Sequence, residues 1–297
     1  MMTNAARLQT LLEGGIPDFP PHWELVFQIE REMFGLEEKN PADQIEKYLR
    51  LAEEYDWAAV PGPNPYATES IRAMKAAIGD RALVPGFDAG GVFWMPSGND
   101  IMDFVVRLFE EPDDLHAEAR RKCEQAKALL RAQADAGADF YVLTYDFGFN
   151  NAPFISPAQF RSLVTPYLTE LVETAHALGK RVILHSDGCL TEIIDQLYAT
   201  GLDGYQSVDP QGHMDIRTVR AQYPDWLLMG NVECRMLQDG DEEEIRASVR
   251  YCMAHGGIGK RYIFSTSNCI FHGMPVQSYR TMLDEYQTCR QQGLKAV

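Results

Sequence analysis

Short apolar runs and longer amphipathic segments alternate along the 297 residues of the chain. The apolar runs are rich in branched and aromatic residues and end in polar or turn-forming residues, which is typical of buried parallel strands. We expect eight strands, over residues 22–27, 57–61, 82–88, 139–146, 182–184, 204–209, 226–233 and 261–268. The pattern predicts an α/β protein.

Between most of these runs, apolar residues recur at the spacing of an amphipathic helix. A capping box at 156–159, with Pro157 at the first helical position, marks the start of one helix. The first predicted helix precedes the first strand and forms a short N-terminal helical extension. We expect helices over residues 5–13, 42–54, 101–109, 115–136, 157–177, 191–199, 214–222, 241–254 and 277–292.

Eight strands separated by helices over nearly 300 residues indicate a (β/α)8 barrel, also called a TIM barrel. We expect a single domain over residues 1–297. An open doubly wound sheet is the structural alternative. It is disfavoured because no Gly-x-Gly-x-x-Gly follows the first strand.

Charge and composition narrow the classes of partner. The chain has 27 Lys and Arg against 43 Asp and Glu, and its net charge of −16 repels nucleic-acid backbones and anionic lipid surfaces. We therefore expect neither nucleic acid nor a membrane as a partner. No apolar run approaches the roughly 20 residues that cross a bilayer, and the first residues lack the apolar region of a secretory signal, so a cytoplasmic location is expected. The six cysteines include no Cys-x-x-Cys pair, which argues against a disulfide scaffold and a zinc ribbon.

Polar residues follow nearly every predicted strand, and in a barrel the carboxyl ends of the strands meet at one mouth, where ligands bind. The richest strand end is His185-Ser-Asp187, directly after the apolar run 182–184. A core histidine that is hydrogen-bonded to Asp187 is the alternative explanation of this pair. The other candidates at the mouth are Glu24, Tyr66, Asp88, Tyr145, Asp146, Asp209, Asn231, Glu233, Asn268, Cys269 and His272.

Four motifs resemble the uroporphyrinogen decarboxylase superfamily, and the resemblance covers almost the whole chain. They are Leu-His-Ser-Asp-Gly at 184–188, Gly-Asn-Val-Glu-Cys at 230–234, Ser-Thr-Ser-Asn-Cys-Ile-Phe-His-Gly-Met-Pro at 265–275 and Phe-Ile-Ser-Pro at 154–157. The resemblance implies a barrel enzyme. Besides the decarboxylase, the superfamily contains zinc-dependent methyltransferases that move methyl groups between corrinoid proteins and thiols, and demethylating enzymes that load corrinoid proteins.

The chain departs from both kinds of relative at the residues that define them. The decarboxylase carries an arginine-rich segment after its first strand, which grips the carboxylates of the substrate, but no arginine lies between Arg7 and Arg31 here. An acidic cavity would also oppose a polyanionic porphyrinogen. The thiol methyltransferases have His-x-Cys on the fifth strand and a further cysteine after the eighth, where this chain has His185, Asp187 and Asn268.

The residues at these positions are still of metal-ligand types. Zinc accepts histidine nitrogen, carboxylate oxygen and thiolate sulfur, and catalytic zinc sites keep one position open. We expect His185 and Asp187 as zinc ligands, completed by Glu24 or Cys269. A buried, small apolar role is the alternative for Cys269.

We therefore predict a corrinoid-linked methyltransferase, which moves a methyl group between a small methylated compound, such as a methoxylated aromatic, or a thiol and a corrinoid-binding protein. The metal would polarise the atom that loses the methyl group, and the cobalt of the corrinoid would accept that group. The catalytic candidates are Tyr145, Asp146, Asn231, Glu233, Asn268 and His272. Aromatic residues near the mouth, Tyr66, Trp94 and Phe147, are expected to face the corrinoid partner, and a role as cavity wall is the alternative.

Two other functions remain open. One is a metal-independent decarboxylase, a lyase that acts on a small carboxylic acid or a porphyrinogen-like substrate. The other is a non-catalytic binding barrel. The sequence also leaves the oligomeric state open, with a homodimer as one option.

Overall fold

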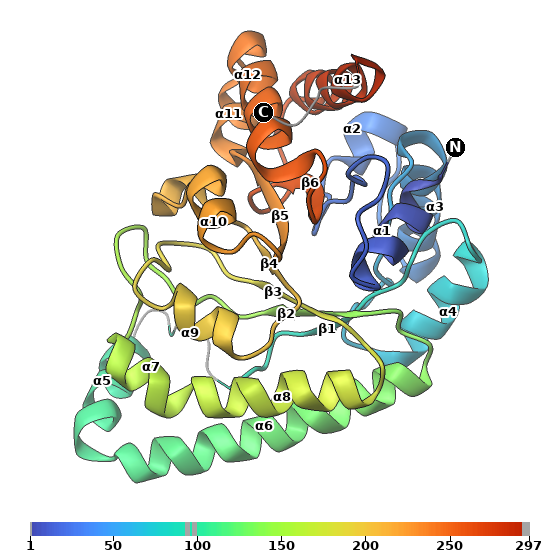
Figure 1. Cartoon of the computed structure of the whole chain (residues 1–297). Helices are drawn as coiled ribbons and strands as arrows, with labels where there is room; N and C mark the ends of the chain where they lie inside the picture. The colour runs from blue at the N-terminus through green and yellow to red at the C-terminus, as the bar shows by residue number, and fades with distance from the viewer. Residues whose placement is uncertain (1, 93–95, 97–99, 293–297) are drawn as a thin grey trace.

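The computed structural model describes residues 2–92, 96 and 100–292. Its centre is a parallel sheet of six strands that pair in chain order (Figure 1). Each strand lies within, or overlaps by all but one residue, a strand predicted from the sequence. The strands are β1 Gly86–Asp88, β2 Tyr141–Thr144, β3 Val182–His185, β4 Gly204–Gln206, β5 Leu227–Val232 and β6 Tyr262–Thr266.

Backbone hydrogen bonds continue this sheet into a closed ring. The Phe264 amide in β6 donates to Pro21 O at 2.9 Å, and the Ala58 amide donates to His22 O at 2.9 Å. The Leu83 amide then donates to Ala58 O at 3.0 Å, just before β1 begins. The first two predicted strands are therefore present as short bridged segments, and the predicted (β/α)8 barrel fold is confirmed.

Helices surround the barrel on its outer side (Figure 1). They are α1 Asn4–Leu12, α2 Glu30–Phe34, α3 Pro41–Tyr55, α4 Thr68–Ile78, α5 Asp100–Glu110, α6 Pro112–Asp135, α7 Pro157–Leu163, α8 Thr165–Ala177, α9 Ile194–Ala199, α10 Ile216–Gln222, α11 Cys234–Asp239, α12 Glu242–Cys252 and α13 Val276–Gln292. Within the described ranges, none of these helices combines the length and the apolar character needed to span a bilayer.

Three helices, α2, α4 and α11, were not predicted from the sequence. Helices α2 and α11 are each shorter than two turns, so they carry no periodic signal. Helix α4 does bury an apolar stripe, Ile71, Met74 and Ile78, but between these residues the segment is polar or small. The predicted helix over 157–177 is divided into α7 and α8 near Pro166, because a proline has no N–H to donate to the carbonyl four residues earlier and its ring clashes with that carbonyl.

Helix α1 closes the amino-terminal end of the barrel. Leu8 and Leu11 are fully buried, and the last carbonyls of the helix accept hydrogen bonds from arginines that precede two strands. Arg181 Nε donates to Leu12 O at 2.9 Å, and Arg261 Nη2 donates to Leu11 O at 3.0 Å. The N-terminal helical extension therefore covers the end of the barrel that lies opposite the carboxyl ends of the strands.

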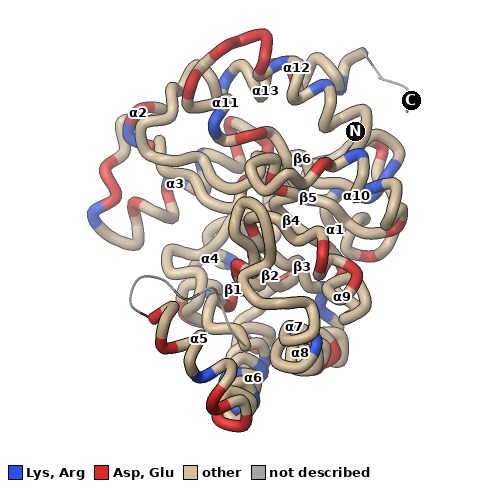
Figure 2. Tube along the Cα trace, turned by 90° about the vertical axis from the view of Figure 1, so that its left-hand side faces the viewer, with Lys and Arg blue, Asp and Glu red and all other residues tan. Residues whose placement is uncertain are grey.

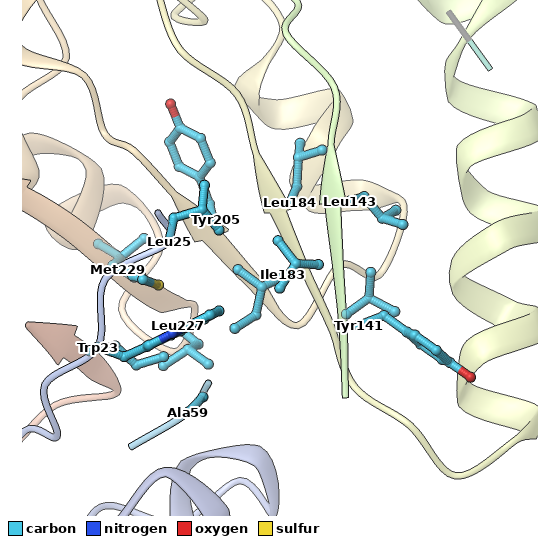
Figure 3. Close-up of a cluster of buried hydrophobic side chains, with 14 of the residues drawn as sticks. Trp23, Leu25, Ala59, Tyr141, Leu143, Ile183, Leu184, Tyr205, Leu227 and Met229 are labelled. Atoms are coloured by element: carbon cyan, nitrogen blue, oxygen red, sulfur yellow. The ribbon is translucent and has the colours of Figure 1, made fainter. Parts of the chain in front are cut away.

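Apolar side chains fill the barrel below its mouth (Figure 3). Trp23, Ile183 and Met229 point toward one another and are almost completely buried. On the outer side of the sheet, Tyr141 donates its hydroxyl to Leu130 O of α6 at 2.6 Å. The interior is thus a packed core, and a ligand finds room only near the carboxyl ends of the strands.

Candidate metal site at the barrel mouth

Two neighbouring strands bring one histidine and two carboxylates together. Thr144 of β2 and His185 of β3 are register partners, so Asp146 and Asp187 lie side by side two residues farther along. The ligand atoms of Asp146, His185 and Asp187 all lie within 4.8 Å of one another. His185 Nε2 is 3.6 Å from Asp146 Oδ1 and 4.0 Å from Asp187 Oδ2, which is too long for hydrogen bonds. The spacing leaves room for a cation between the three side chains.

The orientation of the His185 ring follows from its neighbour Gln206. The side-chain amide nitrogen of Gln206 donates to Thr266 O at 3.4 Å and to Ser267 O at 3.2 Å. This places Gln206 Oε1 against His185 Nδ1, which must therefore carry the proton and donate. The lone pair of neutral His185 is then on Nε2 and faces the two carboxylates. A metal-binding histidine needs this tautomer and this kind of supporting hydrogen bond.

Asp187 is held from both sides. Ser207 Oγ donates to Asp187 Oδ1 at 2.6 Å, and Asn268 Nδ2 donates to Asp187 Oδ2. Burial raises the pKa of Asp187, and the nearby Asp146 carboxylate raises it further. The His185 ring and the hydrogen bond from Ser207 lower this pKa and offset part of the increase. Two acidic groups this close therefore carry an electrostatic cost that a bound cation would remove.

The cluster opens into a cavity of about 460 Å³. Five of the residues predicted for the site line this cavity: Asp146, His185, Asn268, Cys269 and His272. Tyr66, predicted to face a partner, also lines it and is 43% exposed at the rim. The cavity therefore combines a candidate metal-binding cluster with an aromatic edge.

Cys269 lies in the cavity wall but outside the cluster of Asp146, His185 and Asp187. Its Sγ donates to Asn268 Oδ1 at 2.7 Å. Burial raises the pKa of the Cys269 thiol, and the nearby Cys234 and Asp187 raise it further. The structure brings Asp146, rather than Cys269, into ligand range of His185.

Glu24 lies elsewhere, in a network that joins the first strand segment to β6. Its Oε2 accepts from Ser265 Oγ at 2.9 Å, from the Thr266 amide at 3.0 Å and from Thr266 Oγ1 at 2.7 Å. Its Oε1 lies 3.2 Å from His22 Nε2, and the residue is fully buried. These donors occupy the carboxylate, and the structure does not bring Glu24, one of the two alternative further ligands, to the cluster of Asp146, His185 and Asp187.

Tyr145 and Phe147 are also buried rather than presented to the cavity. Tyr145 donates its hydroxyl to Asp88, whose carboxylate also accepts from the Gly91 amide at 3.2 Å. Phe147 is fully buried and packs edge-on against Phe160, with ring centroids 5.0 Å apart. Both residues support the loops at the mouth, and the expected contact of Phe147 with a partner does not fit its burial. Trp94 lies outside the described residues.

Asn231 and Glu233 line a different cavity, of about 630 Å³, between the end of β5 and α12. Asn231 Nδ2 donates to Val208 O at 2.9 Å, and its Oδ1 accepts from Cys252 Sγ at 3.3 Å. The structure therefore does not bring these two predicted catalytic residues to the His185 cluster.

Several residues of the site escaped the sequence analysis. Gln206 is the last residue of β4 and Ser207 directly follows the strand, so the strand-end rule could have found both. Glu30, Glu38 and Lys47, by contrast, line the cavity from α2, α3 and the segment between them. Nothing in their local sequence separates them from the many exposed charges of the chain.

Comparisons with known proteins identify the family of the chain and agree with its fold. The family model described as uroporphyrinogen decarboxylase (URO-D) matches residues 31–289. Uroporphyrinogen decarboxylase from Anaeromyxobacter sp. (strain Fw109-5) is 24% identical over 252 residues, which are 81% of this chain and 69% of that protein. The uroporphyrinogen decarboxylase of Prochlorococcus marinus (strain MIT 9303) is 25% identical over 264 residues, 84% of this chain and 71% of that protein.

Solved structures share the fold at lower sequence identity. A methyltransferase from Methanosarcina mazei superposes with a TM-score of 0.80 at 16% identity, over 98% of this chain and 100% of that one. A 3-keto-D-glucoside 4-epimerase from E. coli reaches a TM-score of 0.56 at 15% identity, over 90% of this chain and 100% of that one. At these identities the likeness establishes the fold alone.

Proposed function

The chain belongs to the uroporphyrinogen decarboxylase family, and within that family we propose that it is a corrinoid-linked methyltransferase. Its substrate would be a small methylated compound, and a corrinoid protein would be the other partner. The observation that carries the proposal is the cluster of Asp146, His185 and Asp187 at the mouth of the cavity. The overall likeness to a methyltransferase structure is consistent with it.

The lining of the cavity argues against a porphyrinogen substrate. Among its described residues there are one lysine and no arginine, whereas Glu30, Glu38 and Asp146 contribute carboxylates. A substrate with many carboxylates would meet repulsion there without a guanidinium to bind it. The proposal therefore differs from the activity after which the curated relatives are named.

The donor set fits a divalent ion, for which we propose zinc. One imidazole and two carboxylates are common zinc ligands and leave a position for substrate. A bound ion would polarise the heteroatom that loses the methyl group and make it a better leaving group. Gln206 orients His185, and Ser207 and Asn268 orient Asp187, so these residues keep the ligand atoms in place before substrate arrives.

The corrinoid is best supplied from outside the barrel. The interior is packed with apolar side chains, and the cavity of about 460 Å³ is needed for the methylated substrate itself. The corrinoid would supply the nucleophile that takes the methyl group, while the bonding electron pair stays on the substrate heteroatom. A partner protein must therefore bring its corrinoid to the mouth.

Helix α5 offers a surface for that partner. It follows β1, so its first turn lies on the mouth side of the barrel, and Figure 2 shows it beside α6 and α7. Met102, Val105, Val106 and Phe109 form an exposed stripe at helical spacing, with Phe109 73% exposed. Monomeric surfaces seldom expose so many large apolar side chains in a row.

Replacing Met102 and Phe109 with serine should lower methyl transfer to a corrinoid protein about tenfold or more, because each buried large apolar side chain contributes about 1.5–3 kcal/mol to an interface. Transfer to free cobalamin should stay at the parent rate. Ile16→Ser is the control, since Ile16 is exposed near the opposite end of the barrel. Equal loss with both acceptors would remove α5 from the docking surface.

The proposed function is tested with purified, zinc-loaded protein and a panel of methoxylated and methylated small molecules. We expect methylation of free reduced cobalamin, followed by its visible absorption, with at least one donor. Uroporphyrinogen should be neither converted nor inhibitory. Formation of a decarboxylated porphyrinogen, or of carbon dioxide from a small carboxylic acid without metal, would instead establish the lyase alternative.

A further inference from the structure

The wall of the cavity also contains a buried charge cluster. Glu30 of α2, Glu38, and Lys47 of α3 all line the same cavity as His185. Lys47 Nζ pairs with Glu38 Oε1, donates to Phe27 O at 3.2 Å and lies 3.9 Å from Glu30 Oε2. The side chains of Lys47 and Glu30 are only 6% and 9% exposed. The cluster is therefore part of the cavity wall and not a solvated surface pair.

This cluster is short of positive charge and of hydrogen-bond donors. It contains two carboxylates and one ammonium group. Glu30 Oε2 is buried and has no hydrogen-bond partner among the described residues, because 3.9 Å to Lys47 Nζ exceeds hydrogen-bonding distance. Buried carboxylate oxygens in folded proteins are normally hydrogen-bonded, so Glu30 Oε2 is available to accept a hydrogen bond from a molecule that enters the cavity.

We infer that this part of the cavity binds the ammonium group of the substrate, which donates an N–H to Glu30. The other end of the molecule then reaches Asp146 and His185, which line the same cavity. The inference rests on the proposed function for the fate of the methyl group and adds the substrate class: a methylated compound that also carries an N–H-bearing ammonium group.

The other walls of the cavity suit the body of such a molecule. Tyr48, Tyr66 and Phe87 line the cavity, and the rings of Tyr66 and Phe87 meet edge-on with centroids 6.4 Å apart. Aromatic faces attract cations and also pack against apolar or aromatic groups. The side chain of Glu30 is itself only 9% exposed, so a charge pair formed there is weakly screened by water.

An anionic ligand bound by Lys47 is the competing explanation. Lys47 Nζ is already engaged by Glu38 and by Phe27 O, and its charge lies over the Tyr48 ring at 4.8 Å. A carboxylate entering here would have to displace Glu38 and would face Glu30 at close range. A quaternary ammonium is also disfavoured, because it has no N–H to donate to Glu30.

The test is a calorimetric titration of the purified full-length protein, without corrinoid, at neutral pH. The two probes are 2-(4-methoxyphenyl)ethylamine and its neutral analogue 2-(4-methoxyphenyl)ethanol, in which a hydroxyl group replaces the ammonium group. We expect the amine to bind about tenfold tighter or better, since hydrogen bonds between ionised partners are about twice as strong as neutral ones. In Glu30→Gln the preference should fall below about threefold, because the amide no longer pairs with the charge.

Glu46→Gln is the matched control, because Glu46 is an exposed glutamate on the helix that carries Lys47, and it should keep the preference. If Glu30→Gln does not fold, Glu38→Gln should show a reduced preference. Equal affinity of the two probes, no binding of the amine, or a preference that survives Glu30→Gln would each overturn the inference. Binding of the probes can be measured without methyl transfer. A preference for the amine without any turnover would therefore contradict the proposed function and support the amine site. Turnover of neutral methyl donors alone would support the proposed function and contradict the amine site.

Discussion

His185→Ala is expected to leave the purified protein without stoichiometric zinc and to lower the rate of methyl transfer at least about 100-fold. The loss of a residue that only supports a metal ligand typically lowers metal affinity or activity about 10–100-fold, and the loss of a direct ligand should exceed this. His185 is the only nitrogen ligand of the cluster formed by Asp146, His185 and Asp187 in the described part of the chain. Two carboxylates alone hold zinc weakly. Metal analysis of protein purified without chelators, together with single-turnover kinetics, measures both effects.

Two further variants sharpen this prediction. Gln206→Leu should bind zinc about 10–100-fold more weakly, because it removes the acceptor that fixes the His185 ring, together with the hydrogen bonds from Gln206 to Thr266 O and Ser267 O. His176→Ala is the control: His176 also pairs with a carboxylate, Asp203 at 2.7 Å, but does not line the cavity. One zinc per chain retained in His185→Ala would show that the metal, if present, is held elsewhere.

The barrel could be predicted because its signals are local. Each apolar run that forms a strand, such as 182–184, is short and bounded by polar residues, and each long helix repeats its apolar residues at helical spacing. The lengths of the first two strands could not be predicted in this way. Residues 22–27 and 57–61 read as strands, yet each joins the ring through isolated bridges, and the extent of pairing depends on neighbours distant in sequence.

The sequence predicts which residues of the site lie close together where these residues follow the ends of neighbouring strands. Asp146 and His185 meet because β2 and β3 are adjacent and their ends are in register. The direction of a side chain and the identity of its partner are not local properties. Glu24 also lies in a predicted strand and was expected at the mouth for the same reason. In the structure it is hydrogen-bonded to Ser265 and Thr266, which are more than 240 residues away in the sequence. The sequence alone could not show that these donors already occupy it.

Glu24→Ala is expected to destabilise the fold by about 3–5 kcal/mol, the range found when one member of a buried charged network is removed. The change leaves three donors on Ser265 and Thr266 without an acceptor in a region that water does not reach. It also weakens the junction where the first strand segment meets β6 through isolated bridges such as His22 to Phe264. Urea denaturation measures the free energy of unfolding.

Ser265→Ala is the graded control, because it removes one of the three donors and leaves the Glu24 carboxylate with the two from Thr266; its cost should be about 1–2 kcal/mol. The decisive comparison is the zinc content of the protein that remains folded. Glu24→Ala should hold as much zinc per folded chain as the parent, because Glu24 is hydrogen-bonded to Ser265 and Thr266 of β6 and does not belong to the His185 cluster. A variant that keeps the stability of the parent and loses its zinc would make Glu24 a metal ligand, and the buried network would then have to open when the metal binds.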